Sequence, residues 1–153
     1  MIAAHTLEID LSRGLPANVE AERSILGAIL LDNLAYSEAA EHLEPEDFSL
    51  DSHRRIFTRM VDLAESSRPI DMITLVEELD HRKELEAIGD VGYISGLVDG
   101  VPNRPSIAHY VLIVREKAQL RGLIAAAQVA IARALDGEQP VEIAGDSSRP
   151  FST

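Results

Sequence analysis

The stretch SIAHYVLIVREKAQLRGLIAAAQVAIARAL, residues 106–135, decides the fold class of this protein. It contains no proline, and its apolar residues recur at the three- and four-residue spacing of an α-helix. At 1.5 Å per residue, a single helix over this range extends ~45 Å, longer than a compact domain of this chain's size is wide. The sequence therefore predicts one long helix that protrudes from a smaller globular head.

The apolar residues of this long helix form two stripes. The first stripe comprises Ile107, Tyr110, Val111 and Val114. The second comprises Ile113, Leu120, Ile124, Ala127, Ile131 and Ala134. A helix that is apolar on two sides needs partners on both. We expect one stripe to pack on the head and the other to meet another helix, although the second stripe could also fold back on the head.

The remainder of the chain is also patterned for helices, with no sustained alternation typical of a strand. Short helices are expected from about residue 18 to 32, 35 to 42, 51 to 64, 71 or 74 to 80, 85 to 88, and 93 to 98. The predicted fold class is all-α. Its expected divisions are a flexible tail over 1–17, a helical head over 18–103, the long helix over 104–136, and a loop or disordered tail over 137–153.

Several residues are candidate helix caps. Asn18 is a predicted N-cap, because a side-chain oxygen there can accept a bond from the first helical turn. Ser49 or Asp51 is expected to cap the helix over 51–64, and Thr74 with Glu77 matches a capping box. Gly137 is a predicted helix stop.

Composition excludes several classes of protein. A formal charge of −12 repels a phosphate backbone, so DNA contact is expected to be weak and local at most. The long helix is the exception, since residues 106–136 carry +2 through Arg115, Lys117, Arg121 and Arg133 against two acids. The absence of cysteine rules out disulfides and thiolate zinc sites, and no apolar run could span a bilayer. We expect a soluble, cytoplasmic protein with no membrane partner.

No catalytic, cofactor or metal site is predicted. The P-loop pattern G-x-x-x-x-G-K-[ST] is missing, and the glycines at 89, 92 and 96 lack the spacing and the preceding strand of a nucleotide loop. The histidines are scattered, and the acidic pairs Glu20 with Glu22 and Glu77 with Glu78 are interpreted as solvating charges on exposed faces. A DNA-reading second helix over 72–80 would be acidic, the wrong sign for a DNA groove.

Several segments, taken in order, resemble one known family. They are Leu15-Pro16, residues 20–27 (EAERSILG), 30–32 (LLD), Phe48 with 53–57 (HRRIF), 69–75 (PIDMITL), Gly89 to Leu97, and 113–117 (IVREK) with Leu120-Arg121. In order and spacing over about 120 residues these segments resemble the N-terminal domain of bacterial replicative helicases of the DnaB type.

This resemblance implies a helical head followed by a helical hairpin, with six copies forming a collar of paired protomers. The implied partners are therefore a second copy (a dimer, or a hexamer built as a trimer of dimers), the C-terminal domain of primase and, in some bacteria, a helicase loader. ATP hydrolysis belongs to a separate RecA-like domain in that family, so this chain is expected to be a non-catalytic scaffold. The interface residues we select are Tyr93, Ile113, Arg115, Lys117, Leu120, Arg121, Ile124, Ala127 and Ile131. For Tyr93 the alternative is an ordinary place in the core of the head.

The sequence departs from the family at the second helix of the hairpin. Residues 141–150 (VEIAGDSSRP) contain glycine, paired serines and proline, which oppose a long helix. An alternative function follows from this departure: a standalone regulator or decoy that binds the helicase or primase and perturbs assembly.

Overall fold

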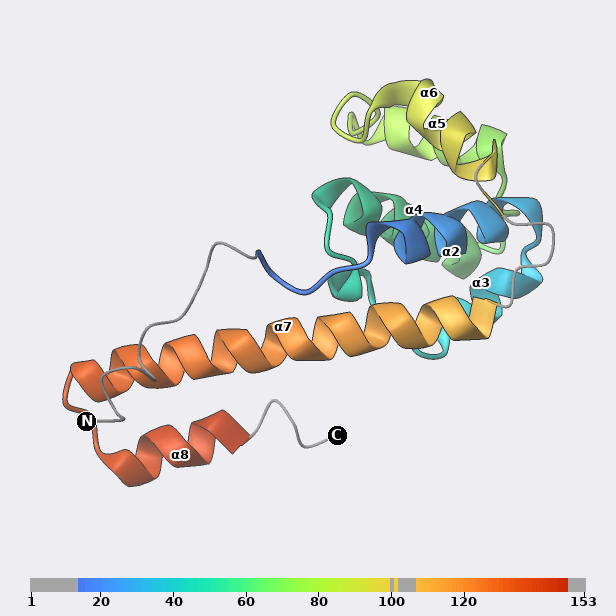
Figure 1. The fold of residues 1–153 in the computed structure, drawn as a ribbon. Helices are drawn as coiled ribbons and strands as arrows, with labels where there is room; N and C mark the ends of the chain where they lie inside the picture. The colour runs from blue at the N-terminus through green and yellow to red at the C-terminus, as the bar shows by residue number, and fades with distance from the viewer. Residues whose placement is uncertain (1–13, 100, 102–106, 149–153) are drawn as a thin grey trace. The chain divides into compact units, whose positions relative to one another are not determined.

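The computed structural model describes residues 14–99, 101 and 107–148, and throughout these ranges the regular structure is helical (Figure 1). The helices are α2 (Val19–Leu31), α3 (Leu34–Ala40), α4 (Asp51–Glu65), α5 (Met72–His81), α6 (Asp90–Asp99), α7 (Ile107–Leu135) and α8 (Pro140–Ser148), with a 3-10 turn, η2, at Pro45–Asp47. The predicted all-α class is confirmed. Most of the expected tail over 1–17, the prolines at 102 and 105, and the last five residues lie outside the described residues.

The chain divides into two compact units, which we describe separately. The head unit is Ala17–Gln119, and the second unit contains Pro16 together with α7 from Leu120 onward and α8. The boundary falls within α7, which is a single helix of 29 residues.

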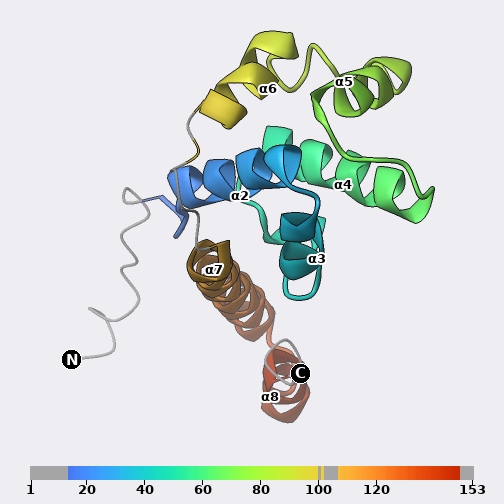
Figure 2. The same ribbon diagram turned by 90° about the vertical axis from the view of Figure 1, so that its right-hand side faces the viewer.

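The core of the head unit forms around α2. This helix contacts α3, α4 and α6, and α5 packs on both α4 and α6, so that α5 and α6 lie on one side of α2 and α4 (Figure 2). The rings of Phe48 and Phe57 pack 5.0 Å apart at full burial. Ile107, Val111 and Val114 are buried in this same core, so the first stripe of the long helix packs on the head.

A close approach between α2 and α6 depends on one glycine. Gly27 faces the end of α6, and a Cβ at this position would lie closer than 3.0 Å to the carbonyl oxygen of Leu97 and to the Val101 side chain. Any side chain at residue 27 would therefore push the two helices apart.

The start of α2 is as predicted, that of α5 matches one of the two predicted positions, and the predicted cap of α4 differs. Asn18 caps α2, with its Oδ1 accepting from the Ala21 amide at 2.9 Å, as predicted. In α5 the N-cap is Asp71, which exchanges hydrogen bonds with Thr74. The predicted start near Asp71 is therefore confirmed, and the alternative Thr74–Glu77 box is wrong by one turn. The predicted side-chain cap of α4 is also wrong: Leu50 occupies the cap position, because Ser49 binds Glu22 and Asp51 pairs with Arg55 inside the helix.

The segment between α5 and α6 also differs from expectation. Residues 85–88 form turns, where a short helix was predicted. Gly89 follows at a φ of +101°, a left-handed conformation that ends any helical run before α6 begins.

The Asp71 cap provides a first prediction. Replacing Asp71 with alanine is expected to lower the free energy of unfolding by about 1 kcal/mol, because the Thr74 amide at the start of α5 loses the Asp71 carboxylate as its acceptor. Thermal unfolding followed by circular dichroism measures the loss. The matched control is Asp80→Ala at the other end of α5, where a carboxylate opposes the helix dipole and its removal should cost nothing. Equal losses in the two variants would contradict the capping role.

The segment from the end of α7 to α8 agrees with one prediction for the C-terminal residues and differs from another. Gly137 ends α7 at a φ of +82°, with its amide bonded to Ala134 and that of Glu138 bonded to Arg133, so the predicted stop is confirmed. The predicted loop over 137–153 is wrong for Pro140–Ser148, which forms α8. Proline is favoured at the first helical position, and Glu142 lies in the first turn, so the isolated Gly145 does not prevent a short helix.

Candidate protein-interaction site

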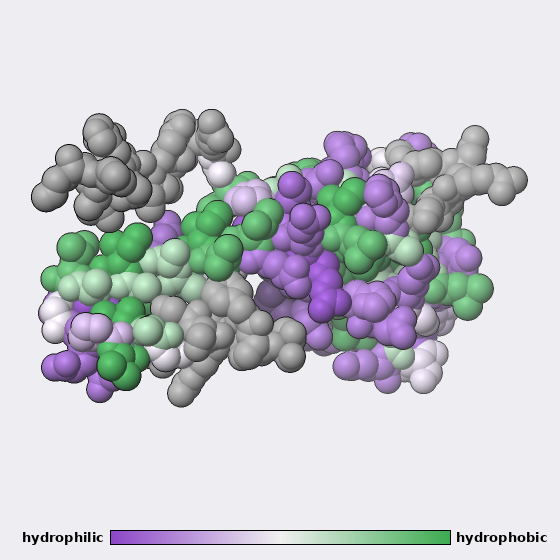
Figure 3. All heavy atoms as spheres, turned by 60° about the horizontal axis from the view of Figure 1, so that its bottom comes forward, coloured by the Kyte–Doolittle hydropathy of each residue, from purple (hydrophilic) through white to green (hydrophobic). Residues whose placement is uncertain are grey.

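An apolar face of α7 lies in the second unit. Residues 120, 124, 127 and 131 follow one another at four-, three- and four-residue intervals, which places them on one side of the helix. Leu120, Ala127 and Ile131 are exposed, and Ile124 is half-buried. Figure 3 shows apolar surface gathered over this end of α7 and over α8, where Leu123, Leu135 and Val141 are also exposed. We call residues 120, 124, 127 and 131 the α7 face.

The other predicted interface residues of α7 are placed differently. Ile113 is half-buried against the core of the head unit, so part of the second stripe does pack on the head. Arg115 and Lys117 are half-buried. Arg121 donates from Nη1 to the carbonyl oxygen of Pro16 at 2.8 Å. Four of the predicted residues thus share the α7 face. Ile113 does not belong to it, because its side chain packs against the core of the head unit.

A buried polar cluster in the head unit was not predicted from the sequence. Glu22 of α2 is 1% exposed and His53 of α4 is 0% exposed, and Oε1 of Glu22 lies 2.7 Å from Nδ1 of His53. Ser49 donates from its amide and its hydroxyl to Oε2 of Glu22, at 3.0 and 2.6 Å. Nε2 of His53 lies 2.5 Å from the hydroxyl of Tyr93 on α6. The cluster links three helices and the segment before α4.

The carboxylate of Glu22 is the ionised group of this cluster. Burial alone would raise the pKa of Glu22, but the hydrogen bonds from His53 and Ser49 outweigh it and hold the pKa below its ordinary value. Burial raises the pKa of the Tyr93 hydroxyl, opposed by the Arg23 guanidinium, which lies 5.2 Å from the ring centre. Glu22 is therefore an ionised, fully bonded carboxylate at neutral pH.

The placement of Glu22 corrects the interpretation of this residue as a solvating charge. A signal in the sequence did exist, because Glu22 precedes Ile25, Leu26 and Ile29 by three, four and seven residues and so lies on their buried stripe. Tyr93, selected as an interface residue, is half-buried and bonded inside the head. Because Glu22, His53 and Tyr93 bond to one another, the cluster holds α2, α4 and α6 in position.

The described residues contain no group of three or more His, Asp or Glu side chains placed to hold a metal ion. Within the same residues, no helix is both long enough and apolar enough to cross a membrane.

The fold and these surfaces define the class of the protein: an all-α domain of short packed helices followed by one long helix. Comparison with known families is specific. Residues 14–116 match the family described as DnaB-like helicase N terminal domain, and the chain belongs to this family. The resemblance inferred from the sequence is confirmed.

Individual relatives agree with this assignment. The replicative DNA helicase DnaB of Geobacillus stearothermophilus is 43% identical over 109 residues, which are 71% of this chain and 24% of the relative. The replicative DNA helicase DnaC of Bacillus subtilis (strain 168) is 39% identical over the same length. The chain thus spans about a quarter of the length of these curated relatives.

Solved structures are similar over most of the chain. The N-terminal domain of DnaB helicase from Mycobacterium tuberculosis matches with a TM-score of 0.82 at 31% identity, covering 89% of this chain and 96% of that one. A DnaB-like replicative helicase, described together with its interactions with primase, matches with a TM-score of 0.77 at 26% identity, covering 88% of this chain and 32% of that one.

Proposed function

We propose that this chain is a non-catalytic N-terminal scaffold domain of a replicative DNA helicase, mediating protomer assembly and binding primase or a loader during DNA replication in the cytoplasm. The family supports the role in replication. The observation that carries the assembly role is the α7 face, a line of apolar side chains in the second unit with exposed members at Leu120, Ala127 and Ile131.

Scattered apolar residues on a surface need no explanation, but a contiguous apolar stripe on a helix indicates a contact with another helix. Ala127 within the α7 face lets a second helix approach closely. Arg115 and Lys117, on the same helix, would favour an acidic partner surface, as across an interface of complementary charge. A second copy of this chain, with a net charge of −12, would offer such an acidic surface.

Primase binding is proposed on the similarity to a helicase described with its interactions with primase. Tyr93 would contribute to that surface from α6, because its ring is half-exposed while its hydroxyl is bonded to His53. The alternative of a standalone regulator or decoy rests on an incomplete hairpin, and α8, with nine residues against the 29 of α7, keeps the second hairpin helix short.

Light scattering tests the assembly role. We expect the chain to have at least twice the monomer mass, alone or with a primase C-terminal domain. The double variant Leu120→Glu/Ile131→Glu should weaken that association at least tenfold, about 1.4 kcal/mol, because two carboxylates would be buried in an apolar contact.

The control is Leu112→Glu, the same replacement by glutamate at one exposed leucine of α7 within the head unit. It should retain the wild-type mass, and circular dichroism should report the same helix content in all variants. A chain that stays monomeric with and without the primase domain would contradict the proposal.

A further inference from the structure

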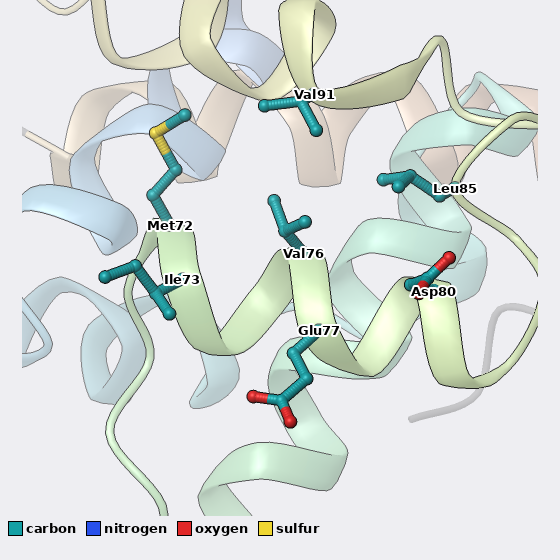
Figure 4. Close-up of a pocket in the computed structure, with 7 residues that line it drawn as sticks. All are labelled: Met72, Ile73, Val76, Glu77, Asp80, Leu85 and Val91. Atoms are coloured by element: carbon teal, nitrogen blue, oxygen red, sulfur yellow. The ribbon is translucent and has the colours of Figure 1, made fainter.

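A groove in the head unit shares no residue with the α7 face. It has a volume of about 560 Å³ and lies between α5 and α6. Met72, Val76 and Leu85 line it from α5 and the following turn, and Val91 lines it from α6, with their side chains converging on the space in Figure 4. Ile73 lines one end.

Two apolar residues that line the groove, Ile73 and Val91, are exposed to solvent. Ile73 is 79% exposed, although it lies in the first turn of α5 beside the buried Leu75. Val91 is 42% exposed at the start of α6. Met72, Val76 and Leu85 pack against the core, so the groove has an apolar floor with apolar side chains at its mouth.

One rim of the groove is acidic and not neutralised. Glu77 and Asp80 border it and form no ion pair with any residue that the structure describes. Glu78, on the same helix, differs, because Arg68 and Arg82 pair with it at 3.3 and 3.1 Å. Glu77 and Asp80 also line a neighbouring polar hollow, so their charges face solvent along the edge of the groove.

We propose that this groove docks a short, basic, amphipathic helix of a partner protein. α5 and α6 have ten residues each, and the ~15 Å of helix that they span matches two to three turns of a bound helix. Apolar residues at i, i+3 or i+4, and i+7 of that helix would enter the groove, and its lysines or arginines would pair with Glu77 and Asp80. This surface is independent of the α7 face and goes beyond the proposed assembly role.

The test uses a fluorescent synthetic peptide of leucine and lysine, with the leucines on one helical face, titrated with the full chain by anisotropy. Two control peptides separate the contributions. One has the same composition in scrambled order, and the other carries glutamate in place of lysine. We expect the scrambled peptide to bind at least tenfold more weakly and the acidic peptide not to bind measurably, since the groove reads both the apolar face and the charge.

Two pairs of protein variants locate the site. Ile73→Ser/Val91→Ser is expected to weaken binding roughly tenfold, whereas Leu112→Ser on α7 should not change it. Glu77→Gln/Asp80→Asn should weaken binding several-fold at low salt, with the difference vanishing at high salt. Glu46→Gln/Glu65→Gln, the same change of charge elsewhere in the head, should have no such effect.

Equal affinity for the scrambled peptide, or unchanged affinity in Ile73→Ser/Val91→Ser, would show that bulk charge attracts the peptide and would overturn the proposal. A fall in the self-associated mass of Ile73→Ser/Val91→Ser would overturn it as well, since the occupant would then be a second copy. Leu120→Glu/Ile131→Glu should still bind the peptide, so failure of the assembly role and failure of this inference are distinguishable.

Discussion

Replacing Gly27 with alanine is expected to destabilise the protein by about 3 kcal/mol, at the upper end of the usual cost of overpacking a core. The added Cβ would meet the backbone carbonyl of Leu97, which cannot rotate away as a side chain does. Alanine also raises helix propensity by about 1 kcal/mol, so a net loss can come only from the clash. Urea unfolding followed by far-UV circular dichroism measures the change.

The matched control for Gly27→Ala is Gly92→Ala in α6. No atom lies within 4 Å of a Cβ at residue 92, and this glycine does not need a left-handed backbone. We expect Gly92→Ala to be neutral or slightly more stable than wild type. If Gly27→Ala were as stable as this control, α2 and α6 would have to lie further apart than the structure shows.

Replacing Glu22 with alanine should destabilise the protein by a similar amount, about 3 kcal/mol, because its buried partners would be left without a hydrogen-bond acceptor. His53 loses its partner at Nδ1, and Ser49 loses the acceptor for its amide and its hydroxyl. Glu20→Ala, two residues earlier on the exposed side of α2, is the matched control and should cost less than about 1 kcal/mol. Equal stability of the two variants would refute a structural role for the cluster.

The pH dependence of stability gives a second measurement on Glu22. Its pKa is lower in the folded state than the value of about 4.3 in an unfolded chain, so its contribution is present above that pH and is lost as the pH falls through the folded pKa. The difference in stability between wild type and Glu22→Gln should therefore be constant near neutral pH and shrink below about pH 4. A difference that grew on acidification would contradict an ionised Glu22.

Local patterns were sufficient to predict most of the helices of this protein. The spacing of apolar residues in 107–135, the cap at Asn18 and the stop at Gly137 depend on neighbours within a few positions, and all three were predicted. α8 was missed for a related reason: composition favoured a loop, but the position of Pro140 at the first turn allowed a helix. The family assignment rests on segments of the same local kind, read in order.

The features that only the tertiary structure decided involve residues far apart in the chain. The bonds of Glu22 reach Ser49 and His53, 27 and 31 residues away, and those of His53 reach Tyr93, 40 residues away. A charged residue on an apolar stripe is normally solvated, so only the packed helices show that this one is buried with its partners. The groove between α5 and α6 is likewise a property of two helices together. The sequence by itself determined most of the helices, with α8 and residues 85–88 as the exceptions, and which family the chain belongs to, because those signals are local. The buried cluster, the contact at Gly27 and the groove required the fold, because each depends on which distant helices meet.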